Sequence, residues 1–314
     1  MMSFFRAPAL RFLVVLLCLY VIFCSTAGVL LADGTLHPAR RPITQQDRDT
    51  ERELTRSLGD NLEDVSLTAR DGSMLRAWLI RPRSGNGNAV ILLHGLADNR
   101  VGMTGYARLM LAHGFSVLLP DARAHGASGG DLATYGLLER YDILDWFNWL
   151  SSTSHPHCIY GLGESMGAAQ LLQSLAVRTN FCSVAAESSF ANFREIAYDR
   201  VGQFFHGGPW MGRFLLRPLV EVAFLRARWK YKLNMQTISP EDAVTLSAAP
   251  VLLIHGQSDS NIPIRNSRLI HAHNPRAILW EVPGAEHCGA VSIAPQEFER
   301  RVLARFAIDP SLHQ

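Results

Sequence analysis

The residues with the clearest chemical potential are the five at 163–167, Gly-Glu-Ser-Met-Gly, with Ser165 at the centre. An apolar run at 158–162 precedes this motif, and a helical pattern at 165–177 follows it. This order predicts a strand, a sharp turn and a helix, with the serine exposed on the turn as a nucleophile. The flanking glycines fit because larger side chains would collide with the strand and helix that pack against the turn. The alternative interpretation is a small serine at a helix N-cap.

A serine hydroxyl is inert near neutral pH unless a base takes its proton, so a histidine oriented by a carboxylate must lie within hydrogen-bonding distance. Asp259 comes just past one predicted buried strand, and His287 comes just past the next. The sequence therefore predicts Ser165 as nucleophile, His287 as base and Asp259 as the acid that orients it. Glu187, at the end of another apolar run, is the alternative acid.

Two backbone N–H groups must also stabilise the oxyanion that forms when the serine adds to a carbonyl group. Met166, the residue after the nucleophile, is expected to provide one, and Leu96, after His94-Gly95 at a strand end, the other. A plain turn at His94-Gly95 is the alternative. The histidines and cysteines show no metal-type spacing, so we expect no metal and no organic cofactor.

The elements that must position these residues follow an alternating pattern. Two β-type runs meet at Asp71-Gly72, a turn signal for an antiparallel hairpin, and short apolar runs then alternate with amphipathic helices. This predicts an α/β fold with a mostly parallel sheet covered on both faces. The expected strands are 64–69, 74–81, 89–93, 116–119, 158–162, 183–186, 251–254 and 277–282, with helices at 102–113, 137–150, 165–177, 264–273 and 296–307.

Residues 64–314 are predicted to form the catalytic domain, and residues 36–63 a polar linker with a short solvated helix near 49–58. The stretch at about 190–242 is too long for one crossover helix and is rich in aromatic residues and arginine. We expect a helical cap insertion suited to an apolar substrate. The alternatives are an excursion packed on the sheet edge, aromatics that only fill the cap's own core, or a membrane-contacting face.

The N-terminal segment, residues 1–35, contains a stretch without charged residues at 12–32, about the length of a membrane-spanning helix. Arg6 and Arg11 before it favour a single-pass anchor with the catalytic domain outside the cytoplasm, although Arg40 and Arg41 beyond it weaken this orientation. The alternatives are a cleaved signal peptide, which would give a secreted or periplasmic protein, and a tethered cytosolic domain.

The bulk composition is that of a globular enzyme. The 314 residues are 48% hydrophobic and 18% charged, and the net charge is only +2, so nothing favours nucleic acid as a partner. Of the five cysteines, Cys158 and Cys182 lie near the starts of two predicted neighbouring strands. They either pair in an oxidising compartment or serve as small buried hydrophobic residues.

Taken together, the motifs resemble the α/β-hydrolase superfamily over about residues 65–306. They are the His94-Gly95 turn, Asp-Ala-Arg-Ala-His-Gly-Ala-Ser at 121–128, the motif around Ser165, Ser-Pro-Glu-Asp-Ala at 239–243, Asp259 and His287. The Gly-Glu-Ser-Met-Gly motif is similar to the Bem46-like and prolyl-oligopeptidase-related branch. The resemblance implies an eight-stranded sheet whose first hairpin is antiparallel, and a loop at 121–128 that is not a second catalytic set.

The expected function is a membrane-anchored serine hydrolase that cleaves a carboxylic ester of a small, apolar acyl substrate. Carboxylesterase comes first because the predicted cap is apolar and no separate domain limits access. A thioesterase or serine peptidase of the same fold is the alternative. A catalytically silent binding module is the alternative from another class.

Overall fold

The computed structural model describes residues 6–307. Residues 1–5 of the predicted anchor segment and 308–314 of the predicted catalytic domain lie outside the described part. The chain forms two compact units. One joins the N-terminal helix to residues 194–236, and the other holds residues 37–193 and the chain from Thr237 onward.

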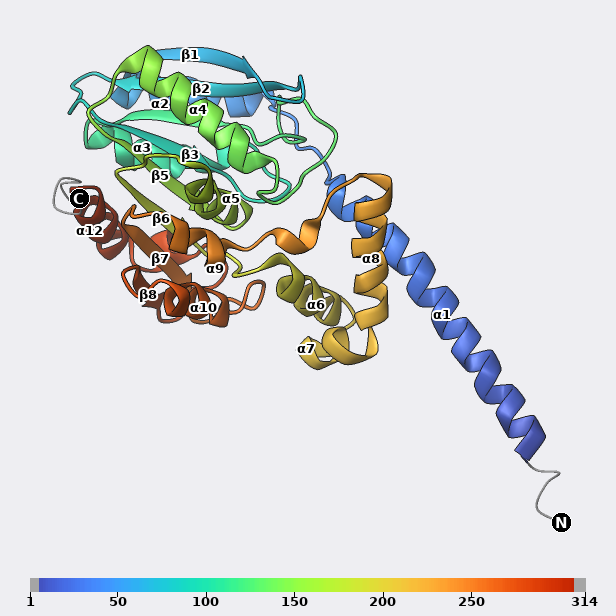
Figure 1. Cartoon of the computed structure of the whole chain (residues 1–314). Coiled ribbons are helices and arrows are strands. Elements are labelled where there is room, and N and C mark those ends of the chain that lie inside the picture. The colour runs from blue at the N-terminus through green and yellow to red at the C-terminus, as the bar shows by residue number, and fades with distance from the viewer. Residues whose placement is uncertain (1–5, 308–314) are drawn as a thin grey trace. The chain divides into compact units, whose positions relative to one another are not determined.

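The larger unit is built on an eight-stranded sheet in the order β1-β2-β4-β3-β5-β6-β7-β8 (Figure 1). β2 runs antiparallel to β1 and β4, and all other neighbours are parallel. The predicted α/β-hydrolase fold is therefore confirmed. The strands are β1 (Gly59–Thr68), β2 (Met74–Pro82), β3 (Ala89–Leu93), β4 (Ser116–Pro120), β5 (Ile159–Glu164), β6 (Ser183–Glu187), β7 (Val251–Gly256) and β8 (Ile278–Val282).

Helices cover both faces of this sheet because its central strands are apolar on both sides. Along β3, Val90 and Leu92 belong to one core layer, whereas Ile91 and Leu93 belong to the other. The first layer includes residues of α2 (Gln45–Leu58), α3 (Thr104–Ala112), α11 (Ala290–Ile293) and α12 (Pro295–Phe306). The second includes residues of α4 (Glu139–Ser154), α5 (Met166–Ser174) and α10 (Arg265–His273). Short turns complete the unit at Arg100–Met103, Leu175–Val177, α9 (Pro240–Ala243) and Val244–Leu246.

The stretch predicted as a linker, 36–63, is more structured than expected. Thr44 and Asp47 exchange hydrogen bonds in a capping arrangement, so α2 begins at Gln45 rather than near Asp49. The helix is not simply solvated, because Leu54 is fully buried in the core beneath the sheet. β1 begins at Gly59, before the predicted start at Asp64, because the hairpin pairing with β2 continues through a bulge.

The smaller unit contains α1 (Arg6–Leu36), α6 (Phe193–Phe204), α7 (Gly208–Trp210), a π-turn at Met211–Leu215, α8 (Arg217–Lys230) and a short turn at Met235–Thr237. Within α1, the span Pro8–Leu36 contains an 18-residue window with a mean hydropathy of 2.6, so the helix is long and apolar enough to cross a membrane. A signal sequence near an N-terminus has the same character. The interpretation of the helical excursion as a cap stays a prediction.

Cys158 and Cys182 form a disulfide, which decides between the two alternatives left open by the sequence. Each cysteine directly precedes a strand, β5 or β6, and their Cα atoms are 5.8 Å apart. The bond joins the amino-terminal ends of two adjacent parallel strands. It leaves Cys18, Cys24 and Cys288 as free thiols in the described chain.

We expect loss of this disulfide to destabilise the sheet unit. The cysteines are 24 residues apart, and a cross-link closing a loop of that length lowers the entropy of the unfolded chain by an amount worth about 3 kcal/mol. Urea unfolding of Cys158→Ser/Cys182→Ser should give a free energy of unfolding lower by this order. Cys288→Ser is the matched control, and an unchanged stability of the double variant would contradict the prediction.

Candidate active site

The turn that carries Ser165 lies between β5 and α5 and is held in a strained conformation. Ser165 has φ 51° and ψ −115°, outside the regions that residues with a side chain favour. A Cβ atom on Gly163 would lie 2.7 Å from the Gly167 backbone, and one on Gly167 would lie 2.3 Å from the Leu93 carbonyl oxygen. Only glycine fits at either position. The Ser165 side chain makes no N-cap hydrogen bond, so the helix-cap interpretation does not hold.

The structure brings Ser165, His287 and Asp259 into one hydrogen-bonded line. Ser165 Oγ lies 2.9 Å from His287 Nε2, and His287 Nδ1 lies 2.8 Å from Asp259 Oδ2. The three residues follow β5, β8 and β7, whose carboxyl ends meet at one edge of the sheet. Because a carboxylate can only accept, the neutral ring donates from Nδ1 and leaves Nε2 free to accept the serine proton.

Asp259 is surrounded by hydrogen-bond donors that keep it ionised. Burial by itself would raise its pKa, but hydrogen bonds from His255, His287 and the Ile262 N–H outweigh burial and hold the pKa well below its ordinary value. The Ile262 and Asn261 N–H groups donate to Oδ1 at 2.8 and 2.9 Å, so Oδ2 is directed at His287. The arrangement fixes the tautomer and the orientation of the imidazole ring.

His94 and His255 lie at the ends of β3 and β7 and shape the backbone around the site. Burial lowers the pKa of His94 to about 4, so its ring stays neutral. Its Nε2 accepts from the Ala122 N–H at 3.1 Å, which makes Nδ1 the donor to the Gly95 carbonyl at 2.8 Å. His255 lies 2.7 Å from both Ser267 Oγ and the Ile262 carbonyl oxygen.

The two residues expected to provide oxyanion donors lie on either side of the serine turn. Met166 is the first residue of α5, so its N–H has no partner within the helix. Leu96 follows β3 and is exposed. A Cβ on Gly95 would be 3.6 Å from Ser165 Cβ, so the turn leading to Leu96 lies directly beside the serine. Their roles as donors stay predictions.

A buried acidic cluster beside the serine was not anticipated as a unit. The Tyr106 hydroxyl donates to Glu187 Oε2 at 3.0 Å and lies 3.3 Å from Glu164 Oε2. Burial, and then the neighbouring Glu187, raise the pKa of Glu164 to about 7, and burial also raises the pKa of Glu187. The sequence feature that could have indicated this cluster is a glutamate at the end of each of two apolar runs. Tyr106 lies within a helix, and no sequence feature connects it with the two glutamates.

Glu187 therefore does not take the place of Asp259. Its Oε1 accepts from the Ala290 N–H at 2.9 Å, and its carbonyl oxygen accepts from the Ser165 N–H at 2.8 Å. The adjacent Ser188 Oγ accepts from the Cys288 N–H at 3.1 Å. The end of β6 thus connects the serine turn to the loop that carries His287.

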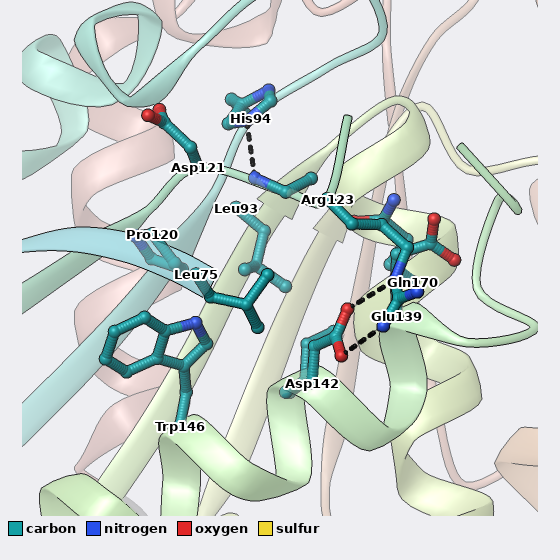
Figure 2. Close-up of a pocket in the computed structure, with 12 residues that line it drawn as sticks. Leu75, Leu93, His94, Pro120, Asp121, Arg123, Glu139, Asp142, Trp146 and Gln170 are labelled. Atoms are coloured by element: carbon teal, nitrogen blue, oxygen red, sulfur yellow. Dashed lines mark hydrogen bonds and ion pairs between the residues drawn. The ribbon is translucent and has the colours of Figure 1, made fainter. Parts of the chain in front are cut away.

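The loop at 121–128 contains aspartate, histidine and serine but forms a structural network. Asp121 pairs with Arg100 at 2.7 Å, and Ser128 Oγ donates to the Asp121 carbonyl oxygen. Arg123 makes a two-point contact with Asp142 beside a small cavity with room for about one water (Figure 2). The cavity belongs to this buried network and not to the Ser165 line. Within residues 6–307, no group of three or more His, Cys, Asp or Glu side chains is placed to hold a metal.

The raised pKa of Glu164 predicts a pH-dependent cost to stability. Above its ordinary pKa of 4.5, the folded protein retains a proton that the unfolded chain releases, so the free energy of unfolding falls between about pH 5 and 7. Glu164→Gln should remove this cost, with a gain of up to about 3 kcal/mol at pH 8 and almost none at pH 5. Urea unfolding at both pH values measures it. Exposed Glu53→Gln is the control, and equal gains at both pH values would contradict the explanation.

Comparison with known proteins agrees with this fold. A model of the alpha/beta hydrolase family matches residues 90–301. The uncharacterized protein YqkD of Bacillus subtilis is 30% identical over 210 residues, which cover 64% of this chain and 65% of YqkD, just under two thirds of that relative's length. The uncharacterized protein Rv2307c of Mycobacterium tuberculosis is 30% identical over 228 residues, covering 71% of this chain and 72% of that protein. The narrower resemblance to the Bem46-like branch stays a prediction.

Among solved structures, the esterase Pf2001 of Pyrococcus furiosus matches with a TM-score of 0.67 and 24% identity, covering 87% of this chain and 97% of the esterase. At this identity the likeness shows the shared fold. The family model spans well over half of the 314 residues. The chain therefore belongs to the alpha/beta hydrolase family and has the fold of a hydrolase.

Proposed function

We propose that this chain is a serine hydrolase that cleaves a carboxylic ester through an acyl-serine intermediate. One observation carries the proposal: the unbroken hydrogen-bonded line from Ser165 through His287 to Asp259, with contacts of 2.9 and 2.8 Å. A nucleophile, a base with a free acceptor nitrogen and an ionised orienting acid are the parts that acyl transfer requires. The strained turn supports the same interpretation, because it exposes the serine hydroxyl.

In the proposed reaction, Ser165 Oγ attacks the ester carbonyl carbon while His287 Nε2 takes the serine proton. Asp259 stabilises the imidazolium ring, and the N–H groups of Leu96 and Met166 donate to the oxyanion. His287 then gives its proton to the alcohol oxygen as the carbon–oxygen bond breaks, which leaves Ser165 acylated. A water molecule attacks the acyl group with His287 again as base. His287 then returns the proton to Ser165 Oγ as the bond from the acyl carbon to Oγ breaks and the carboxylic acid leaves.

The proposed choice of an ester as substrate rests on a structural relative. Pf2001, which shares the fold, is an esterase. The same atoms would cleave a thioester or a peptide bond, so thioesterase and peptidase activities stay the alternatives, and a chain-length panel of esters, thioesters and amides separates them.

We also propose that α1 is a retained membrane anchor and that the catalytic domain lies outside the cytoplasm. The Cys158–Cys182 disulfide supports an oxidising compartment. Packing supports retention, since a Cβ on Gly28 would lie 2.5 Å from the Leu219 carbonyl oxygen of α8. Asp33, near the end of α1, pairs with Arg226 of α8. A cleaved signal peptide would remove the partner of α8.

Labelling with a fluorophosphonate probe tests the proposed nucleophile. We expect the wild-type chain to be labelled covalently and to hydrolyse p-nitrophenyl esters, and Ser165→Ala to lose both activities, with a fall in kcat of about 10⁴-fold or more. Ser128→Ala, in the structural loop, is the matched serine control for labelling. Labelling that survives Ser165→Ala would overturn the assignment, and a folded wild-type chain without labelling or turnover would favour a silent binding module.

Glu187 is expected to act as a positioning residue for the loop that carries His287. Glu187→Ala removes the acceptor for the Ala290 N–H and the Tyr106 hydroxyl, and we expect kcat to fall about 10- to 100-fold through misplacement of the imidazole ring. KM should change little. Glu187→Gln keeps an acceptor oxygen and should retain most of the activity. An alanine variant with wild-type kcat would show that the loop does not depend on this carboxylate.

A further inference from the structure

The excursion of the smaller unit ends in an exposed apolar tip, which we define as residues 204–215. Five large side chains there are 39 to 77% exposed, far more than the core residues of the same unit. Residues 201–212 contain no Asp, Glu, Lys or Arg. The surfaces of soluble proteins rarely expose so many large apolar side chains together, so the tip has the composition of a contact surface. The five residues are Phe204, Phe205, Trp210, Phe214 and Leu215.

Backbone packing fixes the shape of this tip. A Cβ on Gly202 would lie 2.0 Å from the Gly208 carbonyl oxygen, and one on Gly212 would lie 1.8 Å from the Tyr198 carbonyl oxygen. Because α6 and the π-turn touch backbone to backbone, little room is left for side chains between them. The apolar side chains of the tip are therefore directed outward by the packing itself.

The one cation within the tip, Arg213, is turned back into the unit. It pairs with Asp199 at 3.0 Å and also contacts Glu195, and the Asp199 carboxylate is only 1% exposed. Arg217, just beyond the tip, keeps a side chain that is 59% exposed. Arg217 also pairs with Glu221 at 3.8 Å, but most of its side chain stays open to the surroundings. An apolar surface whose internal charge is neutralised and whose rim carries an exposed cation matches acyl chains bordered by lipid phosphates.

The tip lies against α1 at a defined level. The Phe205 ring packs edge to face on the Phe23 ring, with centroids 6.1 Å apart, and the Tyr20 hydroxyl donates to the Leu215 carbonyl oxygen. Figure 1 shows α8 running alongside α1 beyond this point. The apolar surface of the tip is thus continuous with the exposed apolar surface of α1.

The charge-free part of α1 on the other side of the tip is too short to span a bilayer alone. From Phe12, the first residue after Arg11, to Leu19 the helix rises roughly 12 Å, at 1.5 Å for each residue. The hydrocarbon core of a bilayer is about 30 Å thick. If α1 spans the membrane, the hydrocarbon layer extends past the level of Tyr20 and Phe23, where the tip lies.

We propose that the tip inserts into the outer leaflet of the bilayer that α1 crosses, so that the occupant of this apolar surface is lipid. This rests on the proposed membrane anchor and goes beyond it, because it assigns a second membrane contact to residues 204–215. The smaller unit is then held by a helix and an apolar tip together, which sets the height and tilt of that unit in the membrane.

Two exposed tryptophans of the smaller unit allow a direct test in the full-length protein. Trp210 lies in the tip, whereas Trp229 lies on α8 next to Lys230, which pairs with Asp33. The Trp210 contribution to the fluorescence is the difference between the wild type and Trp210→Phe. In nanodiscs made with lipids brominated along the acyl chains, we expect most of this contribution to be lost. The Trp229 fluorescence, obtained with Trp229→Phe, should resist bromolipid and be quenched by aqueous iodide.

The outcomes separate this proposal from the membrane anchor itself. Resistance of the protein to extraction by alkaline carbonate, together with protection of Cys18 from an aqueous maleimide, reports on α1. If the protein resists extraction but iodide quenches Trp210 and bromolipid does not, the tip proposal is overturned while the anchor stands. If the protein is extracted and Cys18 reacts, both are overturned. Far-UV circular dichroism of each variant checks that it is folded.

Discussion

The close backbone contact around Ser165 is the constraint on which the rest of the larger unit depends. Gly163 and Gly167 let the end of β5 and the start of α5 touch each other and the end of β3, which leaves the serine in a strained conformation. Such strain persists only where the surrounding structure over-determines it. Here the Glu187 carbonyl oxygen supplies part of that support by accepting from the Ser165 N–H, and a buried parallel sheet supplies the rest.

The same edge of the sheet explains how residues from distant loops meet. β5, β6, β7 and β8 are consecutive neighbours, so whatever follows their carboxyl ends is gathered into one region. Ser165, Asp259 and His287 lie in this region and form the hydrogen-bonded line. The Glu187 side chain holds the loop that carries His287 by accepting a hydrogen bond from it. This crowding also buries the Glu164 carboxyl group, which raises its pKa. Its raised pKa means that a proton is retained beside the proposed nucleophile near neutral pH.

The smaller unit is held together by the packing of α1 on α8. α1 is apolar around most of its circumference, yet Gly28 allows α8 to approach it closely, as small residues do between helices in membranes. Near the end of α1, Asp33 accepts hydrogen bonds from Arg226 and Tyr231, which fixes the register of the two helices. The proposed retention of α1 and the proposed lipid contact of residues 204–215 draw on this same packing.

The sequence by itself determined the order and type of the elements and pointed to Ser165, Asp259 and His287. That was possible because apolar periodicity, turn residues and strand ends are local features of the chain. The tertiary structure alone decided the Cys158–Cys182 pairing, the burial of α2 and the packing of α1 on α8. It also gave the choice between Asp259 and Glu187 as the partner of His287. Each of these depends on distances between segments far apart in sequence, which only the assembled fold defines.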